Sequence, residues 1–291
     1  MKKSIFYLMF FLPLNSLAGD LEISEIIAYG GTISNKNIIM TLSAQKGNVS
    51  GDYFYSKYKV SIPLHGSISD SKLHLVEKTL NGDAYIDAEK KEGTIDGTWE
   101  LNGKAHKIHA QALSKSYEDI IKGVDVTKQD DPNKTLNIIF KNGINQSIDI
   151  STLEDSTLII FEDFTFDGYP DMRVLELEAG GNSSFIYFEY DVTTGTYVNS
   201  SAEIRDLVNP RIIHSENTIM STSRDGCCVY YVKKILPKES HFAIYDFESK
   251  SGHVTITNKA TGDVSTKPIG KDYFEDNYLS FTGSIKSSRD Q

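Results

Sequence analysis

A short acidic segment in the middle of the chain carries residue types that bind a hard cation. Residues 162–171 read EDFTFDGYPD, with oxygen-bearing side chains at alternate positions. A tight turn brings alternate oxygens to one centre, and Gly168 supplies the backbone freedom that the bend needs. Calcium prefers carboxylate, hydroxyl and carbonyl oxygens. The predicted ligands are the carboxylates of Asp163, Asp167 and Asp171, the hydroxyl of Thr165 and the main-chain carbonyl of Tyr169.

This segment differs from an EF-hand. The twelfth position of such a loop is here Val174, where an EF-hand has a bidentate Glu, and flanking helices would also be required. Three carboxylates so close together repel one another unless a cation or hydrogen bonds offset the charge. The alternative to a calcium site is a hydrated Asp-Gly turn that binds no ion. We expect a structural ion rather than a catalytic one, because hydrolysis would need an activated water and a partnered base.

Short apolar or alternating runs surround this segment and recur along the whole chain. Gly, Asn, Asp and Ser bound them, and no long helical period interrupts them, so the sequence predicts an all-β protein. A sandwich, a barrel or a propeller fits such short strands better than βαβ units. The clearest predicted strands are 53–55, 59–64, 72–76, 97–101, 107–113, 136–140, 157–161, 173–177, 184–190, 229–233, 241–247 and 253–257.

The series of strands is interrupted at residues 116–133, which could form one helical turn and then run polar towards Pro132, so we predict a linker there between two domains. An N-terminal β domain would then span 19–115 and a second β domain 134–291. The two halves differ in charge. Residues 19–115 carry 11 Lys and 12 Asp+Glu, whereas 116–291 carry 17 Lys+Arg and 28 Asp+Glu. This acidity favours either plain solubility or a cationic partner.

Composition excludes several classes of protein. The chain has 291 residues, 39% of them hydrophobic and 24% charged, with a net charge of -10. It is too apolar for a disordered protein and too polar for a multi-span membrane protein. The negative charge also argues against DNA or RNA as a partner, because binding phosphates requires clustered Lys and Arg.

The first 18 residues, MKKSIFYLMFFLPLNSLA, have the form of a secretory signal. A Lys2-Lys3 head precedes an apolar run, and Ser16-Leu17-Ala18 suits a signal peptidase, so we expect cleavage after Ala18. The apolar run is too short for a membrane anchor. No Cys follows it that could take a lipid. We therefore predict a periplasmic protein that is not a lipoprotein and has no transmembrane segment after cleavage.

The only two cysteines, Cys227 and Cys228, are neighbours in the sequence. In an oxidising compartment they can pair with each other or with another chain. A vicinal disulfide would stiffen one turn without closing a long loop, so we expect little global stabilisation from it. Two reduced thiols are the alternative.

Residues 157–247 contain, in order, the acidic loop, FIYFEYDVTTGTYV, EIRDLVNPRI and SRDGCCVYYV. This order resembles a family of small periplasmic β-propeller-like proteins. In that family a loop of the form D-x-N-F-D-G-x-x-D binds calcium, and an aromatic-Tyr-Asp strand, a Thr-Gly turn and an Asn-Pro step follow it. Characterised members are immunity proteins that inhibit lysozyme-like, peptidoglycan-cleaving effectors of a type IV secretion system. The resemblance covers about the second half of the chain.

The resemblance implies a propeller-like fold for residues 134–291 with calcium as the cofactor. The family's ligand positions match Asp163, Thr165, Asp167, Tyr169 and Asp171, with Thr165 where the family has Asn. Asn209-Pro210 and Cys227-Cys228 match positions that look structural. The family's enzyme-blocking loop cannot be matched to this sequence, so no inhibitory residue is transferred.

We therefore expect a protein that is not an enzyme and that binds and blocks a basic, lysozyme-like peptidoglycan hydrolase. The sequence contains no Gly-x-Ser-x-Gly elbow, no His-Glu-x-x-His and no Gly-rich phosphate loop. The alternative is a carbohydrate-binding or envelope-binding module. A face of the N-terminal domain that contains Tyr and Trp, with residues 52–57 and 97–99, could stack on sugars there, although aromatic residues on strands usually pack in the core. A hydrolase whose paired carboxylates escape notice is the third choice.

Overall fold

A computed structural model describes residues 21–279, so the predicted signal peptide at 1–18 lies outside the described residues. The all-β expectation is confirmed, because strands make up nearly all of the regular structure and no helical element has more than five residues in the described part of the chain. Each predicted strand overlaps an observed one, but the segment 59–64 becomes a strand only from Ile62. Lys59 adopts a left-handed conformation with φ of 52° and ends a tight turn instead.

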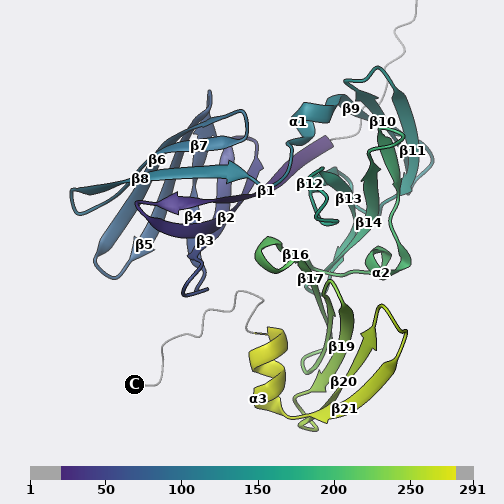
Figure 1. Cartoon of the computed structure of the whole chain (residues 1–291). Coiled ribbons are helices and arrows are strands. Elements are labelled where there is room, and N and C mark those ends of the chain that lie inside the picture. Colours follow the sequence, from purple (N-terminus) through teal and green to yellow (C-terminus); the bar gives the residue numbers. More distant parts are fainter. Residues whose placement is uncertain (1–20, 280–291) are drawn as a thin grey trace, which may run out of the picture.

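The first eight strands form a closed antiparallel barrel, at the left of Figure 1. Each strand pairs with the next one in sequence, and the last pairs with the first to close the ring. Such a ring leaves no free sheet edge. The strands are β1 (Leu21–Ile33), β2 (Lys36–Gln45), β3 (Asn48–Tyr55), β4 (Ile62–Ser69), β5 (Lys72–Thr79), β6 (Gly82–Lys91), β7 (Thr94–Leu101) and β8 (Lys104–Ala112).

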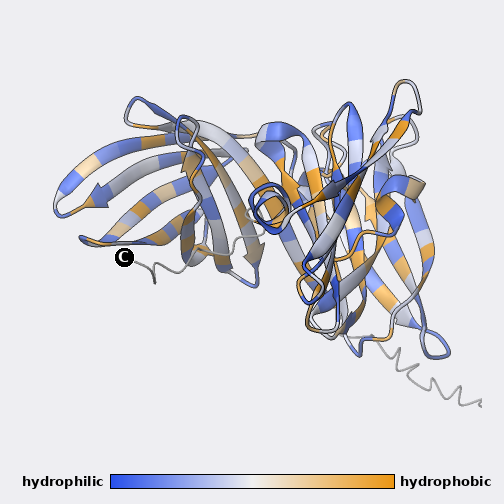
Figure 2. Ribbon diagram, turned by 90° about the horizontal axis from the view of Figure 1, so that it is seen from below, coloured by the Kyte–Doolittle hydropathy of each residue, from blue (hydrophilic) through white to orange (hydrophobic). Residues whose placement is uncertain are grey.

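Side chains fill the inside of the barrel, as expected for eight strands. Hydrophobic and hydrophilic residues alternate along these strands in Figure 2, and the inward positions form one apolar cluster. Tyr53 is 1% exposed and belongs to this core, so it offers no surface to a sugar. Its hydroxyl and the indole of Trp99 donate hydrogen bonds to the buried carboxylate of Glu77, at 2.8 and 2.9 Å.

Strand β1 belongs to two structures at once. Its second half closes the barrel against β8, and a Cβ on Gly31 would lie 2.1 Å from the carbonyl oxygen of His109, so only glycine fits this close approach. Its first half runs parallel to β12 (Thr157–Glu162), with Leu21 opposite Thr157. The barrel and the rest of the protein therefore share a continuous strand rather than only a tether.

Residues 116–133, predicted as a linker, include a helical turn and a strand. These are α1 (Tyr117–Ile120) and β9 (Ile121–Lys128), and the cis peptide between Asp131 and Pro132 follows them. Ser116 caps α1 with its side chain. Glu25 of β1 accepts hydrogen bonds from the Ser116 hydroxyl at 2.6 Å and from the Tyr117 N–H at 2.9 Å. The chain leaving the barrel is thus fixed to β1 as soon as it emerges.

Beyond the barrel lie three further groups of strands. A three-stranded sheet has the order β11-β10-β9, and β12 to β15 extend the edge of β1 in the order β15-β14-β13-β12. One apolar cluster lies between these two groups. The additional elements are β10 (Asn133–Phe140), β11 (Asn145–Ser151), β13 (Asp171–Ala179), β14 (Asn182–Asp191), β15 (Thr196–Asn199) and α2 (Ala202–Arg205).

The last group is a six-stranded antiparallel meander, green to yellow in Figure 1, on which a C-terminal helical segment packs. Phe274 and Tyr278 of that segment are buried against it. The elements are β16 (Pro210–Ile213), η1 (His214–Glu216), β17 (Thr218–Asp225), β18 (Val229–Ile235), β19 (Glu239–Asp246), β20 (Ser251–Asn258), β21 (Val264–Ile269), α3 (Lys271–Phe274) and η2 (Glu275–Leu279).

The propeller-like arrangement expected for residues 134–291 is not found in the described part of the chain. Its sheets contain different numbers of strands, and one of them continues into the barrel through β1, so they do not repeat as equivalent blades around an axis. Short-strand periodicity cannot distinguish these arrangements, because it fixes which face of a strand is buried but not the partner of each edge. Within residues 21–279 no helix is long and apolar enough to cross a membrane.

Candidate functional site

The acidic loop connects β12 to β13, next to the parallel pair of β1 and β12. Aromatic residues alternate with the oxygen-bearing ones and fix the loop to the protein. The ring of Phe164 is 2% exposed and meets Tyr187 edge to face, with centroids 5.7 Å apart. The ring of Phe166 meets His214 in the same way at 5.7 Å. Because aromatic and oxygen-bearing residues alternate, one face of the loop packs against the protein and the other face is polar.

Asp171 organises the inside of the loop and is completely buried. One carboxylate oxygen accepts hydrogen bonds from the backbone N–H groups of Phe164 and Thr165, at 3.0 and 2.9 Å. The other accepts one from the N–H of Tyr190 on β14, at 3.0 Å. This single side chain therefore joins both ends of the loop to the neighbouring strand.

Asp163 has the same role at the tip of the loop. It is 4% exposed, and its two oxygens accept hydrogen bonds from the N–H groups of Asp167 at 3.1 Å and Gly168 at 3.0 Å. Gly168 has φ of 87°, a left-handed conformation that suits glycine, as the sequence predicts for the bend. Asp167 is exposed and accepts a bond from the N–H of Tyr169 at 2.9 Å.

Burial raises the pKa of both inner carboxyl groups. The pKa of Asp171 rises to about 8, because desolvation outweighs the hydrogen bonds from the backbone N–H groups of Tyr190 and Thr165, which favour its charged form. Desolvation also raises the pKa of Asp163, against the hydrogen bond from Gly168. Two carboxylates removed from water in one loop would be stabilised by a cation.

The donor types suit calcium, and one buried atom adds to this fit. The hydroxyl oxygen of Thr165 is buried and has no hydrogen-bond partner among residues 21–279. In the described arrangement, however, the carboxylates bind backbone N–H groups, and no three His, Cys, Asp or Glu side chains of the described residues converge as a metal site. An ion would be held by the predicted set, namely Asp163, Thr165, Asp167, Asp171 and the carbonyl of Tyr169. There it would supply charge compensation.

The loop also touches the chain that leaves the barrel, which the sequence did not predict. The N–H of Lys115 donates to the carbonyl of Gly168 at 3.0 Å. The Lys115 ammonium lies 4.3 Å from the ring centroid of Tyr169, and that ring stacks on Tyr190 at 5.4 Å. The loop therefore connects the segment that follows β8 to strand β14. A single lysine far away in the sequence carries no pattern that would reveal this contact.

A buried ionic cluster lies directly beside the loop and was also missed. Glu162, the last residue of β12, approaches the guanidinium of Arg173 to 2.9 Å and the imidazole of His214 to 3.8 Å. All three side chains are about 5% exposed or less. The sequence could have indicated two of the three residues, because Glu162 and Arg173 stand on either side of the acidic loop.

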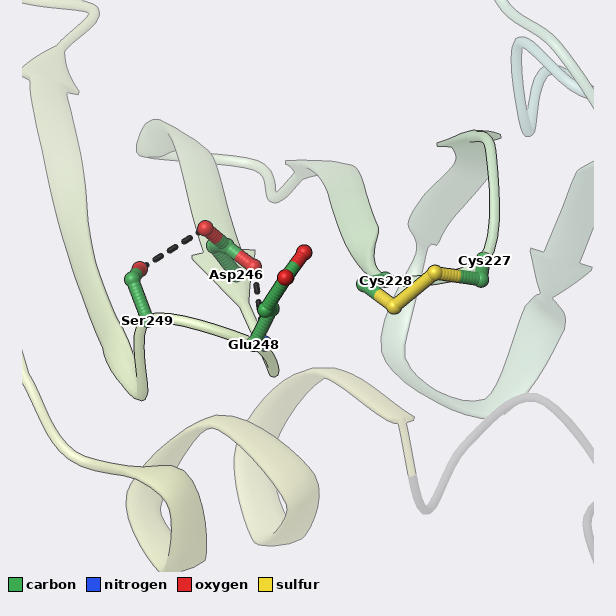
Figure 3. The surroundings of a disulfide bond; sticks show 5 residues. All are labelled: Cys227, Cys228, Asp246, Glu248 and Ser249. Carbon is green, nitrogen blue, oxygen red and sulfur yellow. Dashed lines mark hydrogen bonds between the residues drawn. A yellow bond between two sulfur atoms is a disulfide. The ribbon is translucent and has the colours of Figure 1, made fainter.

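The other two predicted positions are structural in this fold. The side chain of Asn209 accepts a bond from the N–H of Ser183 and donates to the carbonyls of Gly181 and Thr222. Cys227 and Cys228 form a disulfide in the turn between β17 and β18. Figure 3 shows this turn near the turn that follows β19, where Asp246 accepts bonds from Glu248 and Ser249.

No protein-family model matches the chain, and no curated protein is similar to it at a significant level.

Proposed function

We propose that the protein inhibits a basic, lysozyme-like peptidoglycan hydrolase in the periplasm, as an immunity protein, and that calcium in the 163–171 loop has a structural role. The observation that carries this proposal is the acidic loop itself. It stands in the sequence order that resembles the immunity family, and buried aspartates tie it into a preformed turn. The concentration of acidic residues in 116–291 supports a basic partner.

An inhibitor of this kind works by shape and charge rather than by chemistry. A rigid β scaffold loses little conformational entropy when it binds, so more of the contact energy appears as affinity. Complementary charge raises the association rate and weakens as salt screens it. A stable complex would bury about 1,600 Å² in total.

The direct test measures binding and inhibition with a purified basic muramidase of the lysozyme type. We expect a one-to-one complex that stops cleavage of peptidoglycan. Its association rate should fall by about tenfold between low and physiological salt. An association rate that does not change with ionic strength would contradict the electrostatic part of the proposal. Retention of the protein on isolated peptidoglycan without enzyme would instead favour the envelope-binding function, and turnover of peptidoglycan would favour a hydrolase.

A matched pair of variants locates the charge that matters. Glu176 and Glu178 are exposed on β13, whereas Asp83 and Glu100 are exposed on the barrel. The double variant Glu176→Lys/Glu178→Lys should slow association strongly. Asp83→Lys/Glu100→Lys changes the net charge by the same amount and should slow it less. Equal effects would show that only the overall charge acts.

Calcium is tested separately through stability. Adding calcium to chelated protein should raise the melting temperature, because a ligand bound only by the native state stabilises it. Asp167→Ala should abolish the rise, and since Asp167 is exposed, the variant should still fold. Asp83→Ala is the control and should respond as the wild type does. A variant at Asp167 that still responds would show that the ion is bound elsewhere.

A further inference from the structure

The disulfide of the chain lies in an exposed hairpin turn. Asp225 and Val229 form the last pair between β17 and β18, so the turn consists of Gly226, Cys227 and Cys228. Cys227 is exposed and Cys228 is half-buried, so a reductant in the solvent can reach the bond. Exposed disulfides are among the more easily reduced ones. The sequence has no third cysteine that could exchange with this pair.

A single hydrogen bond connects these three turn residues to their surroundings within residues 21–279. The N–H of Phe247 donates to the carbonyl of Cys228 at 2.9 Å, one step beyond the pair of Val229 and Asp246 in the β18–β19 ladder. Figure 3 shows the disulfide near the turn that follows β19, where Phe247 lies. A bond between neighbouring side chains restricts the backbone of both residues. We therefore expect that opening the disulfide frees the turn and weakens this hydrogen bond.

The ring of Phe247 connects this turn to the C-terminal helical segment. It meets Tyr230 of β18 edge to face at 5.4 Å and Phe274 of α3 in the same way at 6.2 Å. Phe274 is completely buried and stacks on Tyr245 at 5.1 Å. Phe274 and Tyr278 are the buried residues of the helical segment, and both belong to the cluster against which Phe247 packs.

The helical segment depends on this packing. Its two elements, α3 and η2, contain four and five residues. Helices of that length are not stable in water without tertiary contacts. The segment shares its apolar cluster with Met220, Val232, Ala243 and Val254 of the meander. A weaker contact at Phe247 should therefore increase the local opening of residues 271–279.

We propose that the disulfide between Cys227 and Cys228 is a redox-sensitive switch, and that its reduction by a dithiol loosens the packing of residues 271–279 on the meander. A thiolate of the dithiol attacks one sulfur, so the S–S bond breaks as a mixed disulfide forms. The second thiol of the reductant then displaces the protein sulfur. The protein gains two electrons and two protons as two thiols, and the dithiol becomes a disulfide. The switch needs neither calcium nor a hydrolase, so it can fail or succeed independently of the proposed function.

The test treats the full chain with dithiothreitol in the absence of denaturant. Alkylation counted by mass spectrometry should show that both cysteines become reduced. Hydrogen exchange at the Phe247 amide and at residues 271–279 should then become at least about fivefold faster, whereas exchange in the barrel should not change. A disulfide that resists dithiothreitol in the native protein would overturn the proposal. Unchanged exchange at residues 271–279 after reduction would overturn it as well.

Variants separate the disulfide from its connection to the helical segment. Cys227→Ser/Cys228→Ser should show the fast exchange with and without dithiothreitol, and a response of this variant to the reductant would contradict the assignment. Phe247→Leu stays apolar but loses the ring contacts, so residues 271–279 should exchange equally fast in its oxidised and reduced forms.

Phe242→Leu is the matched control, because Phe242 also lies on β19 but is 43% exposed, and it should respond to reduction as the wild type does. A Phe247→Leu variant that still responds like the wild type would show that the ring does not connect the two sites. If Phe247→Leu does not fold, reduction of the wild-type protein and the serine variant still decide.

Discussion

The barrel encloses one apolar cluster, whereas the rest of the described chain divides its apolar residues among three. The partners of the buried charged side chains also differ between the barrel and the rest of the described chain. Within the barrel, the carboxylate of Glu77 is bonded to two aromatic donors of the same core. In the second part, which is the described chain after the barrel, Asp163 and Asp171 accept hydrogen bonds from backbone N–H groups, and Arg173 pairs with Glu162.

The difference has a physical origin. A closed ring of strands satisfies its backbone hydrogen bonds along every edge, so its interior can be almost entirely apolar. Open sheets joined by loops leave backbone groups near the core that side chains must satisfy. We therefore expect the barrel to depend on backbone fit and the second part on individual polar side chains.

The largest effect should come from closure of the barrel. Gly31→Val places its Cβ against the carbonyl of His109 and the Cα of Ala110, at 2.1 and 2.5 Å before relaxation, so β1 and β8 must separate. We expect a loss of about 3 kcal/mol or more in the free energy of unfolding. Urea denaturation measures it. Gly123→Val, in β9, meets no atom within 4 Å and is the control. Similar losses for both would refute the dependence on close approach.

Removal of the central carboxylate should have the next largest effect. Asp171→Ala leaves three backbone N–H groups without their acceptor, so we expect a loss of about 3 kcal/mol in chelated protein. Asp167→Ala removes a single bond at an exposed position and should cost less than about 1 kcal/mol. Chemical denaturation measures both variants. If Asp171→Ala were as stable as Asp167→Ala, the loop would not depend on its buried aspartate.

A smaller effect is expected where the two parts meet. Glu25→Ala removes the acceptor for the Ser116 hydroxyl and the Tyr117 N–H, and we expect a loss of about 2 kcal/mol. Glu22→Ala breaks a more exposed pair with Lys46 and should cost less than about 1 kcal/mol. Hydrogen exchange at the Tyr117 amide should rise only in the Glu25 variant. Unchanged exchange there would show that α1 is held by other contacts.

The smallest effect concerns two exposed turns. The pKa of Asp246 is lowered mainly by the hydroxyl of Ser249, whereas that of Asp191 is lowered first by the backbone of Thr193 and then by the side chain of Thr194. Ser249→Ala should therefore raise the pKa of Asp246 more than Thr194→Ala raises that of Asp191. NMR titration of the carboxyl carbons measures both shifts, and the reverse order would contradict this ranking.

The sign of the pH dependence follows from these shifts. A carboxyl group whose folded pKa lies below its unfolded value stabilises the protein above the unfolded pKa. That contribution is lost as pH falls through the folded pKa. Ser249→Ala should therefore weaken the acid-side dependence of stability that Asp246 contributes.

Most strands could be predicted from the sequence because alternating side chains report directly which face is buried. Residues 136–140 and 253–257 are examples, and both lie within strands. The sequence does not predict which strands pair with one another. Nothing local in residues 21–26 indicates that they pair in parallel with residues 157–162, because register depends on contacts far away in the sequence. The closed barrel and the non-propeller arrangement depend on such pairings.

The sequence predicts the candidate loop for a similar reason, but it does not predict the contacts of the loop with other elements. Its oxygen-bearing residues lie within one turn, so their spacing was visible. The bond from the Tyr190 N–H to Asp171 and the contact of Lys115 with Tyr169 join separate elements, and sequence spacing does not record them. Calcium binding remains a prediction that the chelation experiment decides.

The shared strand has a consequence for the order in which the protein assembles. Residues Leu21–Ser24 have no strand partner except β12 within the described chain. Residues 21–24 are synthesised long before β12, so the barrel can close while their edge, where Leu21 and Ile23 alternate with Glu22 and Ser24, is still unpaired. Until residues 157–162 arrive, a chaperone or another nascent chain could pair with it. Any nascent chain that stops before β12 would keep this aggregation-prone end exposed.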